Sequence, residues 1–518
     1  MKKSILVLIT LLVAVLALSA CGSNFTGVKD FGGEVSSNGG FAVVKGDYVY
    51  FINGKGSSSD DNAFGSVVKG ALVRAKLADM KGNGTDVKCE MVVPKLFYTD
   101  YDYQTSGFYI FGDYVYYTTP SANKDKSGKV KNSVVEFTRT KLDGTDTKVI
   151  YSTEGLGTPY KFVADGDKVY LTVYVSETEN DTTANYLVTY SADGKQVTKS
   201  QAIDTYVFSA DDAAADAYYK KKGHNEERDE DESFDEVYRY SLVGKGEVKV
   251  LSGAGMYTSD TGVGTQGVTF GFIKLTKDAL YLSEKSVDTS VSSVTRYYGI
   301  KLADLTENTA HSAMTLLNTG TPEAASIFLT SSVYADLDKI LYNDSSLGLC
   351  LYDYNNQDDV KSFGIETLIH SSDLMGYSYC YDDGEYMYYF GNTYYYRLRI
   401  EDALAANETL QQITFTTTST VSDFYKPEVI GNVVMILNTY DPFYNYVCAY
   451  DMTTVDNIAA EDGQTQEEAV EAFLTDFATA DRAHVLNRLA YRVAILTDSE
   501  QEITDKYMEN NYPETSAS

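Results

Sequence analysis

The chain has 518 residues, with 43 Lys and Arg against 74 Asp and Glu, which gives a formal net charge of -31. A charge this negative repels phosphate backbones and anionic lipid surfaces, so it argues against nucleic-acid binding and against membrane attachment through basic residues. The hydrophobic fraction of 43% and the charged fraction of 23% are typical of a globular chain with a large core. The composition also contains 45 Tyr and no Trp.

The first twenty residues have the pattern of a secretion signal. Two lysines precede an apolar run from Ile5 to Leu18, which is short for a membrane span. The sequence Leu-Ser-Ala-Cys that ends at Cys21 resembles the lipobox of bacterial lipoproteins, in which the chain is cut before a Cys that carries fatty acyl chains such as palmitate. This resemblance predicts a signal peptide over residues 1–20 and a lipidated Cys21 on the outside of the cell membrane. An ordinary signal peptide with a Cys at its boundary is the alternative.

A turn followed by an alternating aromatic strand recurs eight times, at intervals of about 47 to 66 residues. The clear copies are Gly46 to Tyr50, Gly112 to Tyr116 and Gly166 to Tyr170. The weaker copies are Asp216 to Tyr219, Asp278 to Tyr281, Asp338 to Leu341, Gly384 to Tyr388 and Gly431 to Met435. Gly accepts positive φ and short polar side chains bond to the local backbone, so each copy predicts a tight turn between two strands.

Each turn lies inside a predicted four-stranded antiparallel meander. An apolar strand such as Phe41 to Val44 precedes the turn, and a third strand such as Leu72 to Leu77 follows the aromatic one. Asp143-Gly144 is then a hairpin turn into a fourth strand from Lys148 to Tyr151. Such units in series predict an all-β protein, a β-propeller of eight blades over residues 40–455. Seven blades are the alternative, because the fourth copy is the weakest.

The last unit lacks a convincing fourth strand near Asp451. A ring is most stable when no sheet edge is open, so the sequence predicts that Phe25 to Phe31, within the tether of residues 21–39, supplies the outer strand of the last blade. The alternative is Val455 to Ala459. The matching positions of Cys350 and Cys448 in blades six and eight exclude a disulfide between them. Both are expected to be small buried hydrophobic residues.

Several segments depart from the repeat. The charged run from Lys220 to Glu232 is expected to be a solvated, mobile loop, with a cation site as the weaker alternative. The connections between second and third strands, Asn53 to Lys69, Ser121 to Asn132 and Ser176 to Ala184, are expected to be loops that shape a face of the propeller.

The C-terminal segment over residues 460–512 is predicted to be helical. Its apolar residues fall at helical spacing from Val470 to Phe477 and from Val485 to Leu496. Asp481 is a candidate cap for the second helix, and Ser499 with Glu502 resembles a capping box for a third. Removal of Glu461 to Ser518 is therefore expected to leave the propeller folded.

The sequence contains no pattern that marks a catalytic site. It has no Cys-x-x-Cys or His-Glu-x-x-His, and its four His are dispersed at positions 224, 311, 370 and 484. The absence of Trp excludes the Trp-bearing motifs of sialidase-type and quinoprotein propellers. No catalytic, cofactor-binding or metal-ligating residue is predicted, and Cys21 is the one predicted site of lipidation.

Residues 40–452 resemble a family of Tyr-rich propeller lipoproteins from Gram-positive bacteria. The resemblance rests on the repeated Gly-Asp-Tyr-Val-Tyr and on Lys141 to Thr145, which reads Lys-Leu-Asp-Gly-Thr. The chain is also similar in style to the Tyr-Trp-Thr-Asp propellers of cell-surface receptors, although the Trp of that motif is missing. The resemblance implies a fold and a location, and it implies no particular activity.

These observations favour a membrane-anchored binding or scaffold lipoprotein whose propeller face binds a protein, a peptide or a glycan. Tyr suits such a face because it combines a flat apolar ring with a hydroxyl, although packing between blades accounts for many Tyr at strand positions. One alternative is a hydrolase or lyase that acts on an extracellular polymer with carboxylates facing a central channel. Another is an envelope assembly factor that acts through the helical tail.

Overall fold

The computed structural model describes most of the predicted strand regions of the chain. The described residues are 28–36, 38–53, 70–80, 87, 89–93, 95–97, 107–121, 134–154, 158–209, 213–225, 230–255, 257–259, 262–264, 267–288, 295–318, 332–337, 339–344, 346–353, 365–370, 378–382, 385–390, 395–404, 411–412, 428–431, 433–438, 446–451, 463–465, 468 and 484–488. The signal peptide, Cys21 and most of the C-terminal segment lie outside them.

The chain divides into two compact units. The first unit contains residues 1–157 and 421–518, and the second contains residues 158–420. Among its described residues, the first unit has three sheets, each with its strands in sequence order. Their strands are β1 (Ala42–Lys45), β2 (Tyr48–Ile52), β3 (Leu72–Lys76) and β4 (Cys89–Val93); β5 (Tyr109–Phe111), β6 (Tyr114–Pro120), β7 (Val134–Lys141) and β8 (Lys148–Glu154); and β31 (Glu428–Ile430), β32 (Val433–Asn438), β33 (Tyr446–Asp451) and β34 (His484–Arg488).

The second unit has five four-stranded sheets of the same kind and one small hairpin among its described residues. The first three sheets are β9 (Tyr160–Asp165), β10 (Lys168–Glu179), β11 (Thr182–Ser191) and β12 (Gln196–Lys199); β13 (Thr205–Phe208), β14 (Asp216–Asn225), β15 (Glu230–Ser241) and β16 (Glu247–Ser252); and β19 (Val268–Leu275), β20 (Ala279–Ser286), β21 (Arg296–Lys301) and β22 (Thr315–Asn318). The other two are β23 (Ser332–Ala335), β24 (Lys339–Asp344), β25 (Gly348–Asp353) and β26 (Ile365–His370); and β27 (Ser378–Asp382), β28 (Tyr386–Phe390), β29 (Tyr395–Arg399) and β30 (Gln411–Gln412). The hairpin is β17 (Tyr257–Ser259) with β18 (Gly262–Gly264), and the described short helices of this unit are η2 (Leu302–Asp304), η3 (His311–Ala313) and α3 (Ile400–Leu404). The short helix η1 (Leu77–Met80) belongs to the first unit.

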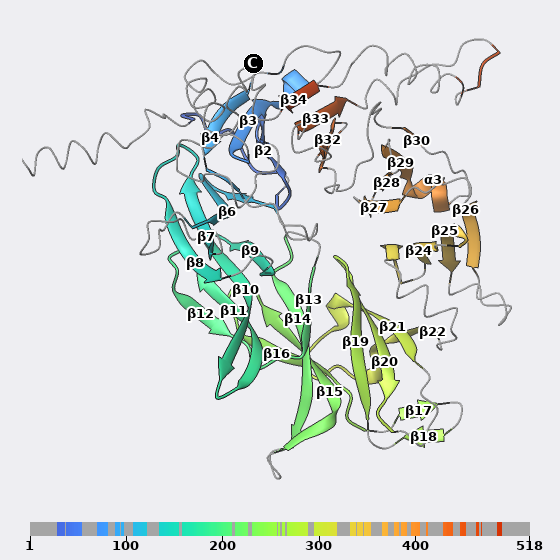
Figure 1. The fold of residues 1–518 in the computed structure, drawn as a ribbon. Helices are drawn as coiled ribbons and strands as arrows, with labels where there is room; N and C mark the ends of the chain where they lie inside the picture. The colour runs from blue at the N-terminus through green and yellow to red at the C-terminus, as the bar shows by residue number, and fades with distance from the viewer. Residues whose placement is uncertain are drawn as a thin grey trace, which may run out of the picture. The chain divides into compact units, whose positions relative to one another are not determined.

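The predicted fold class is confirmed: the protein is all-β, and its repeating unit is the four-stranded antiparallel blade of a β-propeller (Figure 1). The predicted second, third and fourth strands lie where the sequence pattern placed them, as β2, β3, β7, β8 and β12 show. The number of blades in one ring stays a prediction.

The repeated Gly-Asp turn is a two-residue hairpin. Lys45 pairs with Tyr48, and Phe111 pairs with Tyr114, so only Gly and Asp stand between the strands. The φ angles of Gly46 and Gly112 are both 59°. A positive φ at the first turn position is typical of a type II′ turn, whose twist matches the twist of the strands. We call this end of each sheet its Gly-Asp end.

A second contact repeats at the same end. The residue after the third strand donates its backbone N–H to the backbone carbonyl of the acidic turn residue. The pairs are Leu77 to Asp47 at 2.9 Å, Leu142 to Asp113 at 2.9 Å, Leu302 to Asp278 at 2.8 Å and Ile400 to Glu385 at 2.8 Å. The turn therefore joins two hairpins of one sheet, which explains why the turn and the aliphatic residue recur together.

The three sheets of the first unit share one hydrophobic core. Phe51 of the first sheet and Tyr117 of the second belong to the same buried cluster as Met435 and Ala449 of the last. The first and last sheets of the chain therefore pack together, although 334 residues lie between Val93, the end of the first sheet, and Glu428, the start of the last.

The prediction for the outer strand of the last sheet is wrong. Strand β34 pairs with β33 in this position, with Ala449 opposite His484 and Tyr446 opposite Arg488. The described part of Phe25 to Phe31 forms no strand, and Val28 is buried in the core of the first unit instead. The alternative strand, Val455 to Ala459, lies outside the described residues.

The helical prediction for the tail is also wrong at β34, because the predicted second helix includes residues that form this strand. The open edge of β33 offers backbone donors and acceptors, and pairing with it outweighs the helical spacing of the apolar residues. The first predicted helix has a described start: Glu468 is helical, its N–H donates to Thr465 Oγ1 at 3.1 Å, and its carboxylate accepts from Thr465 N at 2.8 Å. This reciprocal pair is a capping box. This cap was not predicted from the sequence, and the caps that were predicted, Asp481 and Ser499 with Glu502, lie outside the described residues.

The connection from Ser176 to Ala184 is not a loop. Strands β10 and β11 pair without a break from Tyr170 opposite Ser191 to Glu179 opposite Thr182. Asn180 and Asp181 close this hairpin with φ angles of 49° and 61°, the type I′ pattern. Most residues of the other two predicted loops lie outside the described residues.

Candidate functional site: the β14–β15 arm

Strands β14 and β15 form the longest hairpin of their sheet. They pair from Asp216 opposite Ser241 to Asn225 opposite Glu230, while β13 pairs with β14 only up to Lys220. We call this hairpin the β14–β15 arm, and its outer part, beyond Lys220, projects from the sheet, as Figure 1 shows. This corrects the prediction of a mobile loop from Lys220 to Glu232, of which residues 226–229 lie outside the described residues.

Opposite charges on the two strands stabilise the arm. Lys222 lies opposite Asp235, and Lys221 lies opposite Glu236. Opposite charges at directly facing positions of an antiparallel pair are favourable, whereas like charges there are destabilising. The run of lysines on β14 and the acidic run on β15 therefore match each other across the hairpin.

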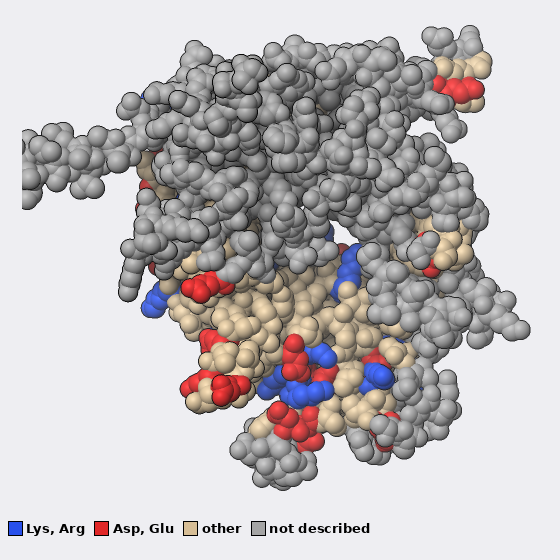
Figure 2. Space-filling view, in the orientation of Figure 1, with Lys and Arg blue, Asp and Glu red and all other residues tan. Residues whose placement is uncertain are grey.

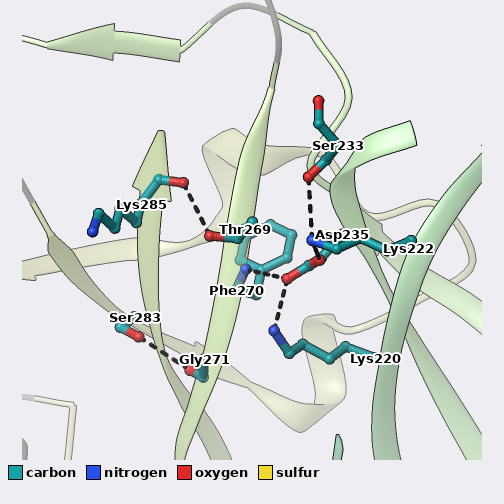
Figure 3. A network of polar contacts seen from close by, with 9 residues as sticks. All are labelled: Lys220, Lys222, Ser233, Asp235, Thr269, Phe270, Gly271, Ser283 and Lys285. Carbon is teal, nitrogen blue, oxygen red and sulfur yellow. Dashed lines mark hydrogen bonds and ion pairs between the residues drawn. The ribbon is translucent and has the colours of Figure 1, made fainter. Parts of the chain in front are cut away.

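Asp235 is the centre of the network on one face of the arm (Figure 3). Its side chain is fully buried, with Oδ2 2.8 Å from Lys220 Nζ and Oδ1 2.7 Å from Lys222 Nζ. The backbone N–H of Phe270 also donates to Oδ2 at 2.9 Å. A buried carboxylate needs such charged and backbone donors, because they offset its loss of water. Since Phe270 belongs to β19, Asp235 fixes the arm to the next sheet of the second unit.

The opposite face of the arm combines tyrosines with carboxylates. The Tyr219 hydroxyl donates to Glu247 at 2.7 Å, and the Tyr238 hydroxyl donates to Glu236 at 2.8 Å. The two rings are stacked, with centroids 5.1 Å apart. Burial raises the pKa of Tyr219 and Tyr238 above the ordinary value, and the hydrogen bonds to Glu247 and Glu236 raise it further. Both hydroxyls therefore stay protonated as donors.

Lysines and one glutamine complete this second network. Lys221 Nζ donates to Gln201 Oε1 at 2.6 Å, and Gln201 Nε2 donates to Glu247 at 2.8 Å. Lys249 Nζ lies 3.0 Å from Glu236 and is partly exposed, with 36% of its side chain accessible. Lys221 Nζ lies 5.6 Å from the Tyr238 ring. The arm and the neighbouring Lys249 of β16 thus hold cations, a carboxylate and a half-buried aromatic ring in fixed positions, and these groups can bind hydroxyl, carboxylate or amide groups of a ligand.

The surface around the arm has mixed charge. In the lower part of Figure 2, where Figure 1 draws β14 and β15, Lys and Arg side chains lie next to Asp and Glu side chains. Tyr174 and Tyr206, with ring centroids 4.7 Å apart, add partly exposed aromatic surface in the same unit. This local mixture of charges differs from the strongly acidic balance of the whole chain.

Other buried carboxylates lie away from the arm's networks. Glu284, 1% exposed, bonds through Oε2 to Nε2 of the half-exposed His311, and its Oε1 has no hydrogen-bond partner among the described residues. In the first unit, Glu136 accepts from Ser121 Oγ at 2.7 Å and lies 3.9 Å from Lys95 Nζ. Burial lowers the pKa of Lys95, and Glu136 opposes part of that shift.

The structure places the residues singled out in the sequence as follows. Cys350 is a buried free thiol, as predicted, and burial raises its pKa; Cys89 is also buried and free. Cys350 and Cys448 are each the third residue of the third strand of their sheets, which confirms their equivalent positions.

His224 Nδ1 lies 3.4 Å from Asp231, whereas His370 and His484 belong to β26 and β34. Cys21, the predicted lipidation site, lies outside the described residues.

Many tyrosines pack inside the sheets, as the repeat predicts. The largest fully buried side chains include Tyr50, Tyr117, Tyr219, Tyr240, Tyr281, Tyr342 and Tyr352. Within the described part of the chain, no group of three His, Cys, Asp or Glu is placed to hold a metal ion. No helix in that part is both long enough and apolar enough to span a membrane.

Sequence reasoning missed Asp235 and Gln201. Gln201 follows β12 in a linker, where nothing in the local sequence connects it to Lys221. Asp235 did have a signal: the lysines of β14 and the acids of β15 stand at mirrored distances from the turn, as expected for two paired strands.

Comparisons with known proteins give no family for this chain. No protein-family model matches it, and no curated protein matches it. A similar solved structure is the β-propeller domain of the Trilobed protease from Pyrococcus furiosus, with 10% identity, a TM-score of 0.33 and coverage of 66% of this chain and 91% of that chain. Apo AztD from Citrobacter koseri has 12% identity, a TM-score of 0.33 and coverage of 74% and 90%, respectively.

A third similar structure is an uncharacterized protein from Listeria monocytogenes, with 10% identity, a TM-score of 0.32 and coverage of 66% of this chain and 89% of that chain. The identities are only 10 to 12%, so no residue role is carried over from these structures to this chain.

Proposed function

We propose that the protein is an extracytoplasmic lipoprotein, anchored by lipid on Cys21, that binds a protein, a peptide or a glycan through the β14–β15 arm. The observation that carries the proposal is the fully buried Asp235, which holds Lys220 and Lys222 and ties the arm to β19. Such a network holds a projecting hairpin in one conformation. A preorganised hairpin loses little conformational freedom when a ligand binds, which favours affinity.

The chemistry of the arm supports a binding role. Tyr238 offers an amphipathic ring, while Lys221, Glu236 and Lys249 offer charged donors and acceptors beside it. Residues that bind ligands are often found on surface segments that a rigid scaffold positions. The lipobox-like sequence ending at Cys21 supports the location outside the membrane.

A photo-cross-linking amino acid at Ser233 tests the proposal on intact cells. Ser233 is exposed on the arm, and the same amino acid at the exposed Asp304, which lies in η2 of the next sheet, is the control. We expect the Ser233 position to capture a ligand that the Asp304 position does not. Equal capture from both positions, or none from Ser233 together with no binding of the purified protein to a glycan array, would contradict the proposal.

A charge reversal on the arm gives a quantitative test. Lys221→Glu places a second carboxylate beside Glu236 and is expected to weaken ligand binding about tenfold, equivalent to about 1.4 kcal/mol. The matched control is Lys301→Glu, an exposed lysine at the end of β21. Unchanged affinity in Lys221→Glu would show that the ligand binds elsewhere.

A further inference from the structure

Residues 28–36 are docked on the Gly-Asp end of the first sheet. Gly46, the turn glycine, donates its N–H to the Glu34 carbonyl at 2.8 Å, and Ser36 donates to the Val44 carbonyl at 3.0 Å. Val35 forms an isolated bridge with Lys45. We call residues 28–36 the docked segment, because backbone bonds hold it against β1 and the first turn.

Side chains at the same end also hold the docked segment. Lys45 Nζ donates to the Gly33 carbonyl at 2.6 Å, and the Tyr50 hydroxyl donates to the Phe31 carbonyl at 3.2 Å. Arg74 Nη1 donates to the Asp30 carbonyl. Arg74 is itself fixed, since its Nε donates to Glu90 at 2.8 Å and its guanidinium lies 4.0 Å from the centre of the Tyr48 ring.

Glycines allow the close approach of the two backbones. A Cβ on Gly46 would lie 2.2 Å from Gly33 N, and a Cβ on Gly32 would lie 2.6 Å from the Lys45 carbonyl oxygen. Both positions also have positive φ, 59° at Gly46 and 76° at Gly32. The turn glycine of the first copy therefore has a second role, to seat the docked segment, whereas a Cβ on Gly112, Gly166 or Gly431 would meet nothing within 4 Å.

The docked segment also reaches the second sheet. Lys141 Nζ, at the end of β7, lies 5.6 Å from the centre of the Phe31 ring. Lys45 and Lys141 lie at the Gly-Asp ends of their sheets, and Arg74 lies two residues from that end of β3. The contact with Phe31 thus places the N-terminal chain across the same end of both sheets.

The distance from Cys21 to this site is short. Val28 follows Cys21 by seven residue steps, and a fully extended chain of that length spans at most about 25 Å. We propose that the docked segment turns the Gly-Asp ends of β1–β4 and β5–β8 toward the lipid bilayer. This inference rests on the proposed lipidation of Cys21. The lipid surface is the partner that this end faces.

The charged residues at the Gly-Asp ends of these two sheets indicate which interaction holds these ends near the membrane. Asp47 and Asp113 are exposed in the two turns, and Asp143 and Asp146 lie nearby in the second sheet. Lys45 and Lys141 lie at the same end, so this mixture of charges gives no strong attraction to anionic headgroups, and the short lipidated tether holds this end near the bilayer. Addition of salt is therefore expected to leave the orientation in place.

Energy transfer in vesicles tests the orientation with the full-length lipoprotein. A donor dye is attached to Asp113→Cys, at the Gly-Asp end of the second sheet, or to Glu154→Cys, at the opposite end of the same sheet. The vesicles are phosphatidylcholine with phosphatidylglycerol and an acceptor dye on the headgroup. The two positions lie about 20 Å apart along the strands, so transfer is expected to be at least about twofold higher from position 113.

A matched insertion separates the tether's effect from other causes. Twenty Gly and Ser residues inserted after Ser23 leave the docked segment intact but add about 25 Å of flexible reach, so the difference between the two positions should disappear. Arg74→Ala should reduce it as well, whereas Arg139→Ala, which removes the equivalent arginine of the second sheet, should keep it.

The two possible failures can be told apart. A mass spectrum of the N-terminal peptide reports whether Cys21 carries lipid, and a protein without lipid there overturns both the anchor and the orientation. A lipidated protein with equal transfer from positions 113 and 154, or with higher transfer from 154, overturns the orientation alone.

Discussion

The tyrosines of the repeat have two roles that depend on their place in the strand. The second Tyr of the first copy, Tyr50, is fully buried. The first Tyr of three copies lies under an arginine of the third strand, at 4.0 Å for Tyr48 and Arg74, 4.7 Å for Tyr114 and Arg139, and 5.4 Å for Tyr386 and Arg399. Stacking of a guanidinium on an aromatic ring contributes about 0.5–1 kcal/mol at exposed sites. The repeated Tyr therefore stabilises the blade itself.

Asp235→Asn tests the importance of the buried carboxylate. The change leaves Lys220 and Lys222 without their shared counter-charge, and loss of one partner of a buried ionic network typically costs about 3–5 kcal/mol. The free energy of unfolding in urea should fall by an amount of this order. Asp231→Asn on the same arm is the control, because the Asp231 side chain is 76% exposed and its loss should change little. Equal effects of the two substitutions would show that the arm does not depend on Asp235.

The residues of the arm were harder to predict than the residues of the blades. Tyr and Gly at repeated positions carry their own signal, since the same residue types recur in one register. Asp235, Gln201 and Phe270 come from different elements, and their contacts depend on how neighbouring sheets pack. A single sequence contains the charges but does not show which of them meet.

At the scale of elements, the turn from Leu142 to Thr145 is a local unit with its own pH dependence. Burial alone would raise the pKa of Asp143, but hydrogen bonds from Thr145 and the ion pair with Lys141 outweigh it and lower that pKa below the ordinary value of 3.8. A carboxylate with a lowered pKa in the folded state contributes stability above its unfolded pKa. That contribution is lost as the pH falls through the folded pKa.

Asp143→Asn is therefore expected to reduce stability at neutral pH and to have a diminishing effect below about pH 4. Denaturation curves of both proteins across this pH range check the prediction. The exposed Asp193, the corresponding residue of the Asp193-Gly194 turn, provides a matched substitution in the third sheet. A constant difference between wild type and Asp143→Asn at all pH values would contradict the role of the ionised carboxylate.

Most strands could be predicted because the sequence pattern of each blade lies within a short stretch of the chain. The Gly-Asp turn, the alternating strand after it and the Asp-Gly turn before the fourth strand all depend on residues close in sequence. The extended hairpins were mistaken for loops because polar residues on both faces, such as those from Ser176 to Ala184, show no buried side. Strands that project beyond their sheet need no apolar face, so hydrophobic alternation does not reveal them.

At the scale of the whole molecule, the strand β34 changes what the C-terminal segment is expected to do. A chain that ends at residue 460 loses the outer strand of the last sheet and exposes the edge of β33. Because Met435, Val447 and Ala449 of that sheet belong to the core of the first unit, this truncation is expected to lower the stability of that unit. This expected loss of stability replaces the expectation from the sequence that removal of Glu461 to Ser518 leaves the propeller folded.

A chain that ends after Arg488 keeps β34 and is the matched control. Thermal unfolding should show a clearly lower midpoint for the shorter chain than for the longer one, and the shorter chain should aggregate through its open edge. Equal midpoints for the two truncated proteins would mean that β34 contributes nothing to the stability of the last sheet.

The strand that completes the last sheet could not be found from its sequence. His484 to Arg488 lies in a stretch with helical spacing, and it is separated from β33 by more than thirty residues. Pairing with a distant edge is a property of the folded chain, because the edge exists only when β31, β32 and β33 have formed. Local propensity therefore gave the wrong structure here.

The shared core of the first and last sheets has a consequence for the order of folding. Val43 and Phe108 are made early in synthesis, but Val433 and Val447, which belong to the same core, are made near the end. During synthesis, apolar side chains of the first sheet therefore stay exposed to solvent until almost the whole chain is present. Contacts this distant in sequence make folding slow and leave intermediates prone to aggregation. Refolding of the first unit should accordingly be a late kinetic step, and the chain should need protection from self-association until that step is complete.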